Sequence, residues 1–132
     1  MSFAVKAIAK NVFKKIFKNL AEELESPVDS VQVGLYFEEG VHKFESYKNF
    51  KRERQIDLED YVGTVVDLSG GLQVIEMTIA QSGPRYAKEI GCTVDEVKVI
   101  FKNRDGDLPL AVLMRGNEKV RNIDINAEFL SN

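Results

Sequence analysis

Apolar side chains recur every three or four positions over the first part of the chain. Between Phe3 and Ser26 they make one continuous stripe, formed by Val5, Ile8, Ala9, Val12, Phe13, Ile16, Leu20 and Leu24. This spacing is typical of an amphipathic α-helix with one buried face. Because Pro27 disfavours helical geometry in the residue before it, we expect this helix to end at Glu25 or Ser26.

Alternation replaces the helical spacing after the proline. Apolar and polar residues alternate over Val31–Glu38, as in a strand with one buried face. A turn at Glu38–Gly40 and a second run over Val41–Tyr47 predict an antiparallel hairpin. The segment Lys48–Gln55 that follows is polar, and we interpret its charged run 51–54 as a solvated loop.

The middle of the chain has two interpretations. Apolar residues return at helical spacing over Leu58–Leu68, with Asp57 as a candidate cap and two glycines, 70 and 71, as a stop. Residues 63–66 are poor helix formers, so a change to strand over 62–68 is the alternative. The next segment, Leu72–Ala80, is predicted to be a strand.

The second half predicts a short helix followed by strands. Ser82–Pro84 resembles a helix start, since proline is tolerated in the first turn, and the helix is expected over Arg85–Ile90. Thr93–Glu96 has the spacing of a capping box, although β-forming residues follow it. Tight turns then separate three predicted strands at Val97–Phe101, Pro109–Met114 and Val120–Ile125.

This order of elements predicts an α+β fold in one domain of 132 residues. Strands joined by short connections pair in antiparallel fashion, and a sheet with one wet face needs a cover on the other. We therefore expect an antiparallel sheet of about five to six strands, covered on one face by the long N-terminal amphipathic helix, with two short additional helices.

Composition changes this picture little. Hydrophobic residues make up 44% of the chain and charged residues 30%, values of an ordinary globular domain. The net charge of −3 opposes bulk attraction to nucleic acid. The single cysteine, Cys92, excludes an internal disulfide, and lysines interrupt any signal-peptide core near the N-terminus, so we expect a reducing, cytoplasmic location.

The ionisable side chains of the first 21 residues are all lysines, at positions 6, 10, 14, 15 and 18. Amphipathic basic helices bind anionic surfaces, where each lysine contributes about 1 kcal/mol. Docking of the helix over 3–25 on an anionic membrane or partner would use Lys10, Lys14, Lys15 and Lys18. The interpretation that we favour is a helix that covers the sheet and turns these lysines to solvent.

A second candidate site combines residues distant in the sequence. Free backbone N–H groups at a helix start favour anions, and Arg85 would add a bidentate contact if a helix begins at Ser82. With His42 and Tyr61, Arg85 forms the candidate ligand-binding set in a cleft between helix and sheet. Capping and packing alone also explain the Ser82 segment, and we favour that explanation.

The chain carries no recognisable catalytic or metal signature. Asn103, Asp105 and Asp107 alternate as in a calcium loop, but Met114 stands where that loop needs its glutamate. One histidine is too few for the usual zinc sites. A nucleophilic pair of Cys92 with His42 is a minor alternative, because Cys92 has apolar neighbours. We predict no catalytic residue, no metal and no cofactor.

The sequence therefore favours a small soluble non-enzymatic interaction or regulatory domain that forms homo-oligomers. This expectation depends on aromatic residues placed at predicted strand ends or loops, where partners bind them: Phe44, Tyr47, Phe50, Tyr86 and Phe129. A protein partner or self-association is expected, and nucleic acid is not. The alternatives are a small-molecule-binding protein or unfamiliar enzyme with a helix–sheet cleft, and anionic docking through the lysine-rich helix.

Overall fold

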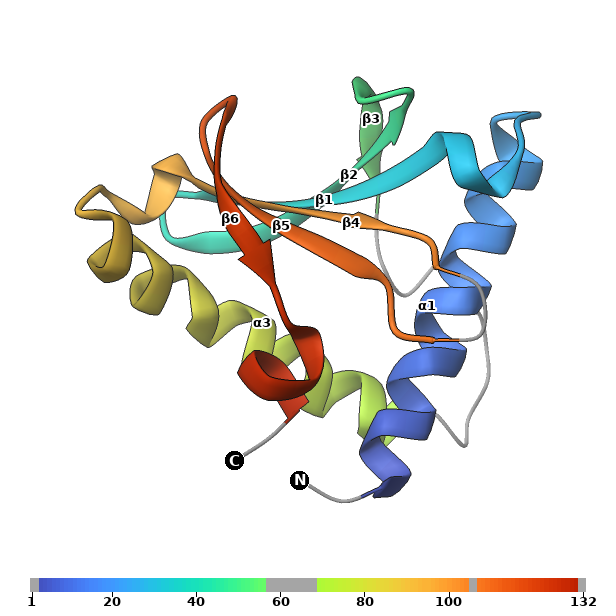
Figure 1. Ribbon diagram of the computed structural model, residues 1–132, viewed down its shortest axis with the longest axis horizontal. Coiled ribbons are helices and arrows are strands. Elements are labelled where there is room, and N and C mark those ends of the chain that lie inside the picture. The colour runs from blue at the N-terminus through green and yellow to red at the C-terminus, as the bar shows by residue number, and fades with distance from the viewer. Residues whose placement is uncertain (1–2, 57–68, 105–106, 131–132) are drawn as a thin grey trace.

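The structure, a computed structural model, describes residues 3–56, 69–104 and 107–130. Its centre is one six-stranded antiparallel sheet with the strand order β3-β2-β1-β4-β5-β6 (Figure 1). The strands are β1 (Val31–Glu38), β2 (Val41–Lys48), β3 (Lys51–Ile56), β4 (Val97–Lys102), β5 (Leu110–Arg115) and β6 (Glu118–Ile123). The predicted α+β class with an antiparallel sheet is confirmed.

Two long helices lie against the same face of this sheet, α1 (Phe3–Glu23) and α3 (Ser69–Ile90) (Figure 1). Shorter helical turns connect or end elements: η1 (Val28–Ser30) and η3 (Val94–Glu96) are 3₁₀ turns, and η4 (Asn126–Leu130) is a π-helical turn. The opposite face, which we call the open face, carries no helix of the described chain. The helices of the described chain therefore cover one side of the sheet only.

The core lies between the helices and the covered sheet face. From α1 it receives Val12, Ile16 and Leu20, which belong to the predicted apolar stripe. The ring of Phe13 meets that of Phe101 in β4 at a centroid distance of 5.2 Å. Each such side chain contributes about 1.5–3 kcal/mol when fully buried, so this stripe accounts for the docking of α1.

The helix ends slightly before the expected position. Its last residue is Glu23, and Glu25 adopts a positive φ of 50°. The backbone N–H of Ser26 donates to the carbonyl of Ala21 at 3.0 Å, which satisfies a carbonyl left over at the helix end. The predicted helix is thus confirmed, and the chain turns away before Pro27 as the proline requires.

Two predicted elements were wrong. The segment predicted as a strand over 72–80 lies in α3, and Ser82–Pro84 lies inside this helix and not at its start. A short apolar run fits helical and extended spacing alike, so periodicity alone did not separate them. The helix predicted over Leu58–Leu68, with its alternative strand over 62–68, falls entirely outside the described residues.

The interpretation of residues 51–54 as a loop was also wrong, because they form most of β3. This strand is at the edge of the sheet, and its residues from Lys51 to Gln55 are exposed. Charged side chains on an edge strand discourage pairing with other chains, so an edge strand resembles a loop in composition. Figure 1 shows β3 at one border of the sheet.

Glycine permits the close approach of α3 to the sheet. A Cβ placed on Gly83 would lie 2.6 Å from ring atoms of Phe37 in β1. No real side chain tolerates such a contact, so the ring of Phe37 and the backbone of α3 touch directly. Pro84 follows on the exposed side of the helix.

Candidate functional site

A groove of about 830 Å³ runs along one flank of α1. The helix forms one wall, while residues 25–28 and four residues between β4 and β5 form the other side, namely Asn103, Arg104, Asp107 and Pro109. Phe13, Phe17 and Ala21 supply its apolar lining. Because the first two are mainly buried, the groove is continuous with the hydrophobic core.

Cations surround this apolar lining. Lys10, Lys14 and Lys18 follow one another at intervals of one helical turn, which places them on one side of α1. Arg104 lies across the groove, in the connection between β4 and β5. The amphipathic pattern of α1 therefore positions three ammonium groups beside the edge of its own buried stripe.

One end of the groove is partly neutralised. Asp107 contacts Lys10 at 3.9 Å and Arg104 at 3.4 Å. The backbone N–H of Leu108 donates to Asp107 at 2.7 Å, and this bond, together with both cations, lowers the pKa of the Asp107 carboxyl. Arg104 also donates to the Leu108 carbonyl at 3.0 Å, which fixes the guanidinium in the wall.

The centre of the groove keeps its charge. Lys14 and Lys18 are exposed, and neither makes an ion pair with any residue that the structure describes. Glu22 and Glu25 line the groove nearer the end of α1. The arrangement thus combines two unpaired ammonium groups, an apolar lining and an acidic end, and it suits a ligand with one anionic group and an apolar body.

Three of the four lysines named from the sequence line the groove. Lys10, Lys14 and Lys18 line the groove, whereas Lys15 is not among its lining residues. The apolar character of α1 at Phe13 was predicted from the sequence, whereas Arg104 was not found. Its signal was weak, because Arg104 comes from a polar turn that is joined to α1 only by the tertiary fold.

The predicted ligand-binding set of Arg85, His42 and Tyr61 is described only in part. Arg85 lies in α3, donates to the backbone carbonyl of Glu128 at 3.1 Å and stacks on the ring of Tyr86 at 4.9 Å. His42 lies in β2 and meets the ring of Phe44 edge to face at 6.0 Å. No hydrogen bond or ring contact joins His42 to Arg85 in the described chain, and Tyr61 lies outside the described residues.

A second charged cluster occupies the open face. Glu45 in β2 is only 3% exposed, and its carboxylate contacts Arg52 at 2.7 Å and Lys98 at 3.5 Å. The hydroxyl of Tyr47 donates to the same carboxylate. Burial and this hydrogen bond raise the pKa of the Tyr47 hydroxyl. This cluster was not predicted from the sequence, since Glu45 occupies an ordinary polar position in the strand alternation.

A third cluster joins α3, β6 and η4. Arg121 donates to both carboxylate oxygens of Glu89 at 2.8 Å and to Glu128 at 2.7 Å and 3.1 Å. The hydroxyl of Tyr86 donates to Glu128 at 3.0 Å. Burial, followed by the bond to Glu128, raises the pKa of Tyr86 to about 12. These contacts hold the C-terminal turn on α3, which is a structural role.

The aromatic residues expected at a partner surface are mostly internal. Phe44, Tyr47, Tyr86 and Phe129 are buried, and Phe50 alone of the five is exposed, at 66%. Cys92 packs partly buried against the core. Within the part of the chain that is described, no three His, Cys, Asp or Glu side chains are grouped as a metal site.

Comparison of the chain with protein-family models, with curated proteins and with solved structures returned no match in any of the three. Neither long helix in the described chain combines the length and the apolar character that crossing a bilayer requires.

Proposed function

We propose that the protein is a non-enzymatic binding domain that holds a small anionic ligand with an apolar body in the groove along α1. The observation that carries this proposal is the position of Lys14 and Lys18, unpaired within the described chain, beside a groove lined by Phe13 and Phe17. Cations above an apolar lining complement an amphiphilic anion in both charge and surface.

The size of the groove supports a small ligand. Small-molecule sites have volumes of roughly 300–1,000 Å³, and the groove of about 830 Å³ falls in this range. It is elongated along α1, from Lys10 to Glu25, which suits a chain-like body better than a compact one. The acidic end at Glu22 and Glu25 would repel the anionic group, so that group would lie near Lys14 and Lys18.

The other sequence predictions are compatible with this role. A regulatory domain that senses a metabolite would need a binding groove and no catalytic group. We retain a cytoplasmic location as part of the proposal, on the grounds of the single Cys92 and the absence of a disulfide. Self-association also stays a prediction, and native mass spectrometry of the purified protein would test it.

Isothermal titration calorimetry with decanoate below its micellar concentration tests the groove. We expect binding to the unmodified protein and an affinity about tenfold lower in the variant K14Q/K18Q, because two favourable charges are lost. The matched control K51Q/K88Q removes two exposed lysines elsewhere and should bind normally. Equal loss in both variants, or no loss in K14Q/K18Q, would contradict the proposal.

Vesicle flotation separates this proposal from docking on a membrane, the other use of the same lysines. Vesicles of phosphatidylcholine and phosphatidylserine provide the same anionic chemistry on a surface. Flotation that K14Q/K18Q abolishes, in a protein that does not bind free decanoate, would establish membrane docking and overturn the small-ligand proposal. Binding of decanoate without flotation would support it.

A further inference from the structure

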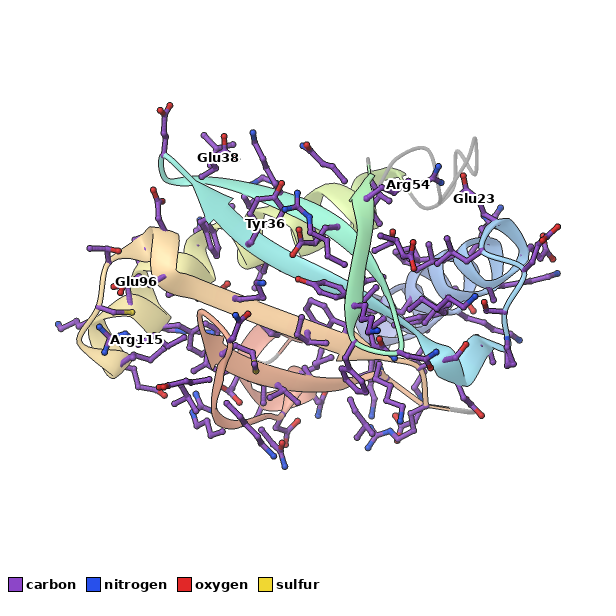
Figure 2. All side chains as sticks on the ribbon, turned by 90° about the horizontal axis from the view of Figure 1, so that it is seen from above. Glu23, Tyr36, Glu38, Arg54, Glu96 and Arg115 are labelled. Atoms are coloured by element: carbon purple, nitrogen blue, oxygen red, sulfur yellow. The ribbon has the colours of Figure 1, made fainter. Side chains whose placement is uncertain are left out.

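The open face of the sheet has its own pattern of charge. Figure 2 views the sheet from the side opposite α1 and α3, with Tyr36 labelled over β1. Residues paired across antiparallel strands point to the same face, so the strand register identifies the members of this face. Gln32, Gly34 and Tyr36 of β1 belong to it, because the alternate residues of β1 lie in the core.

Cations recur across this face in the rows of Gln32 and Tyr36, whereas the row of Gly34 between them contains none. Tyr47 of β2 pairs with Gln32 on one side and with Arg52 on the other, and Gln32 pairs with Lys102. The row of Tyr36 runs from Lys43 in β2 through Lys98 in β4 and Met114 in β5 to Lys119 in β6. The open face therefore carries the cations Lys43, Arg52, Lys98, Lys102 and Lys119.

Among the described residues, acidic groups do not balance these cations. Glu45 is enclosed by Arg52, Lys98 and Tyr47 and presents almost no surface. Glu38, at the end of β1, contacts Lys43 at 3.5 Å. Lys102 and Lys119 make no ion pair with the described residues. The described residues thus make this side positively charged at its surface, although the chain as a whole has a net charge of −3.

Aliphatic side chains fill the space between the cations. Ile100 in β4 pairs with Val112 in β5, Met114 follows in the next row, and Leu110 begins β5 with 47% of its surface exposed. Leu110 pairs with Lys102, so apolar and basic side chains are direct neighbours on one surface. An apolar strip bordered by positive charge is typical of a protein-binding surface.

We propose that the open face binds an acidic segment of a partner protein, in which carboxylates alternate with apolar side chains. Its carboxylates pair with Lys102 and Lys119, and its apolar side chains cover Val112, Met114 and Leu110. Charge complementarity of this kind selects the partner and speeds its association. This surface shares no residue with the lining of the α1 groove, so each proposal can be tested without reference to the other.

Two other occupants fit this surface less well. A second copy of the chain would bring the cations of one open face against the same cations of the other, as two-fold symmetry requires. Single-stranded nucleic acid needs free aromatic rings for stacking. Here Lys98 lies 5.6 Å from the centroid of Tyr47 and Arg52 lies 6.0 Å from that of Tyr36, so cations already cover both rings.

The test uses a short synthetic peptide in which leucine alternates with glutamate. Fluorescence anisotropy at low salt measures its affinity, and amide chemical shifts map the binding surface. We expect shifts in β4 and β5 and an affinity about tenfold lower in the variant K102E/K119E. The variant K14E/K18E reverses the same number of charges in the α1 groove and should bind the peptide normally.

Three results would overturn this proposal. The first is a set of shifts located outside the open face, or equal loss of affinity in K14E/K18E. The second is tighter binding of an oligouridylate than of the peptide at this face. The third is a dimer in sedimentation velocity that K102E/K119E dissociates. Circular dichroism confirms that each variant is folded, and a peptide with lysine in place of glutamate should not bind.

Discussion

The ring of Tyr47 in β2 lies directly over Gly34 in β1, on the open face of the sheet. A Cβ on Gly34 would collide with this ring and would also lie 3.3 Å from the Cγ of Glu45. Because the glycine leaves this space, the tyrosine covers the backbone and its hydroxyl reaches the Glu45 carboxylate. One small residue thus permits the enclosure of a charged group that would otherwise remain in water.

Substitution of Gly34 tests this packing. We expect Gly34→Ala to lower the free energy of unfolding by about 2 kcal/mol, since the new methyl group displaces a buried ring. Urea denaturation measures this loss. In a Tyr47→Leu background the same substitution should have a much smaller effect, because the ring is absent. An equal loss in both backgrounds would contradict the contact.

The turn between β2 and β3 should be improved by glycine. Asn49 and Phe50 have φ values of 52° and 64°, and such turns favour glycine at their second position. Phe50 is exposed, so its ring contributes little burial. We expect Phe50→Gly to raise the free energy of unfolding by about 1 kcal/mol, measured by urea denaturation.

The backbone explanation is tested by a second variant at the same position. Phe50→Ala removes the ring but keeps a Cβ at positive φ, so it should stabilise the protein far less than glycine. The bond from the Phe50 N–H to the Gln32 side chain, at 2.9 Å, is present in either variant. Equal stability of the two variants would show that the ring, and not the backbone conformation, causes the effect.

The contacts of Arg121 should make stability depend on acidic pH. Hydrogen bonds from Arg121 lower the pKa of Glu89. Burial alone would raise the pKa of Glu128, but the hydrogen bonds to its carboxylate, those from Arg121 first among them, outweigh burial and lower this pKa as well. A carboxyl group whose pKa is lowered in the folded state stabilises the protein at pH values above 4.5, the pKa of the group in the unfolded chain. This stabilisation is lost as the pH falls from 4.5 through the lowered pKa of the folded state.

We therefore expect Arg121→Met to cost about 1 kcal/mol at neutral pH, a value discounted for the exposure of Arg121 and Glu89. The difference from the unmodified protein should start to shrink below pH 4.5, where the unfolded chain takes up these protons first, and it should be smallest at an acidic pH below the lowered folded-state pKa of both carboxyl groups. Urea denaturation at both pH values measures it. Arg115→Met, which removes an exposed contact of 3.4 Å to Glu96, should have a smaller effect. A difference that is independent of pH would contradict this account.

At alkaline pH the dependence should come from the buried tyrosines. The pKa of Tyr86 is raised from 10.0 to about 12, so the folded protein keeps this proton after the unfolded chain has lost it. Stability should therefore be complete below pH 10 and decline between about 10 and 12. Tyr86→Phe removes this part of the decline while losing the bond to Glu128. Thermal unfolding measured from pH 8 to pH 11 compares the two proteins, and parallel curves would contradict the prediction.

Local pattern was sufficient for several elements. The stripe over Phe3–Ser26 and the alternation over Val31–Glu38 each extend far enough to define one period, and both elements were confirmed. The run 72–80 was too short for this, because nine residues rich in β-branched side chains fit a strand as well as a helix, so the helix α3 was missed there. Residues 51–56 have the charged composition of an edge strand. Composition does not show that they pair with β2, so residues 51–54 were interpreted as a loop.

Some candidate site residues were likewise predictable from local pattern, and others were not. Lys10, Lys14 and Lys18 could be singled out because they repeat along one side of a helix. Glu45 could not, since its importance comes from Arg52 and Lys98, which lie in β3 and β4 on either side of the hairpin. Contacts across the sheet depend on register, and register is fixed by the packing of the buried face.

The sequence by itself determined the amphipathic helix, the first hairpin, the antiparallel character of the sheet and the basic side of α1, because each depends on neighbours within a few residues. Only the tertiary structure decided that α3 covers the same sheet face as α1, that Arg104 completes the groove, and that the cations of separate strands gather on the open face. These features join residues far apart in the chain, and their positions follow from how the whole core packs.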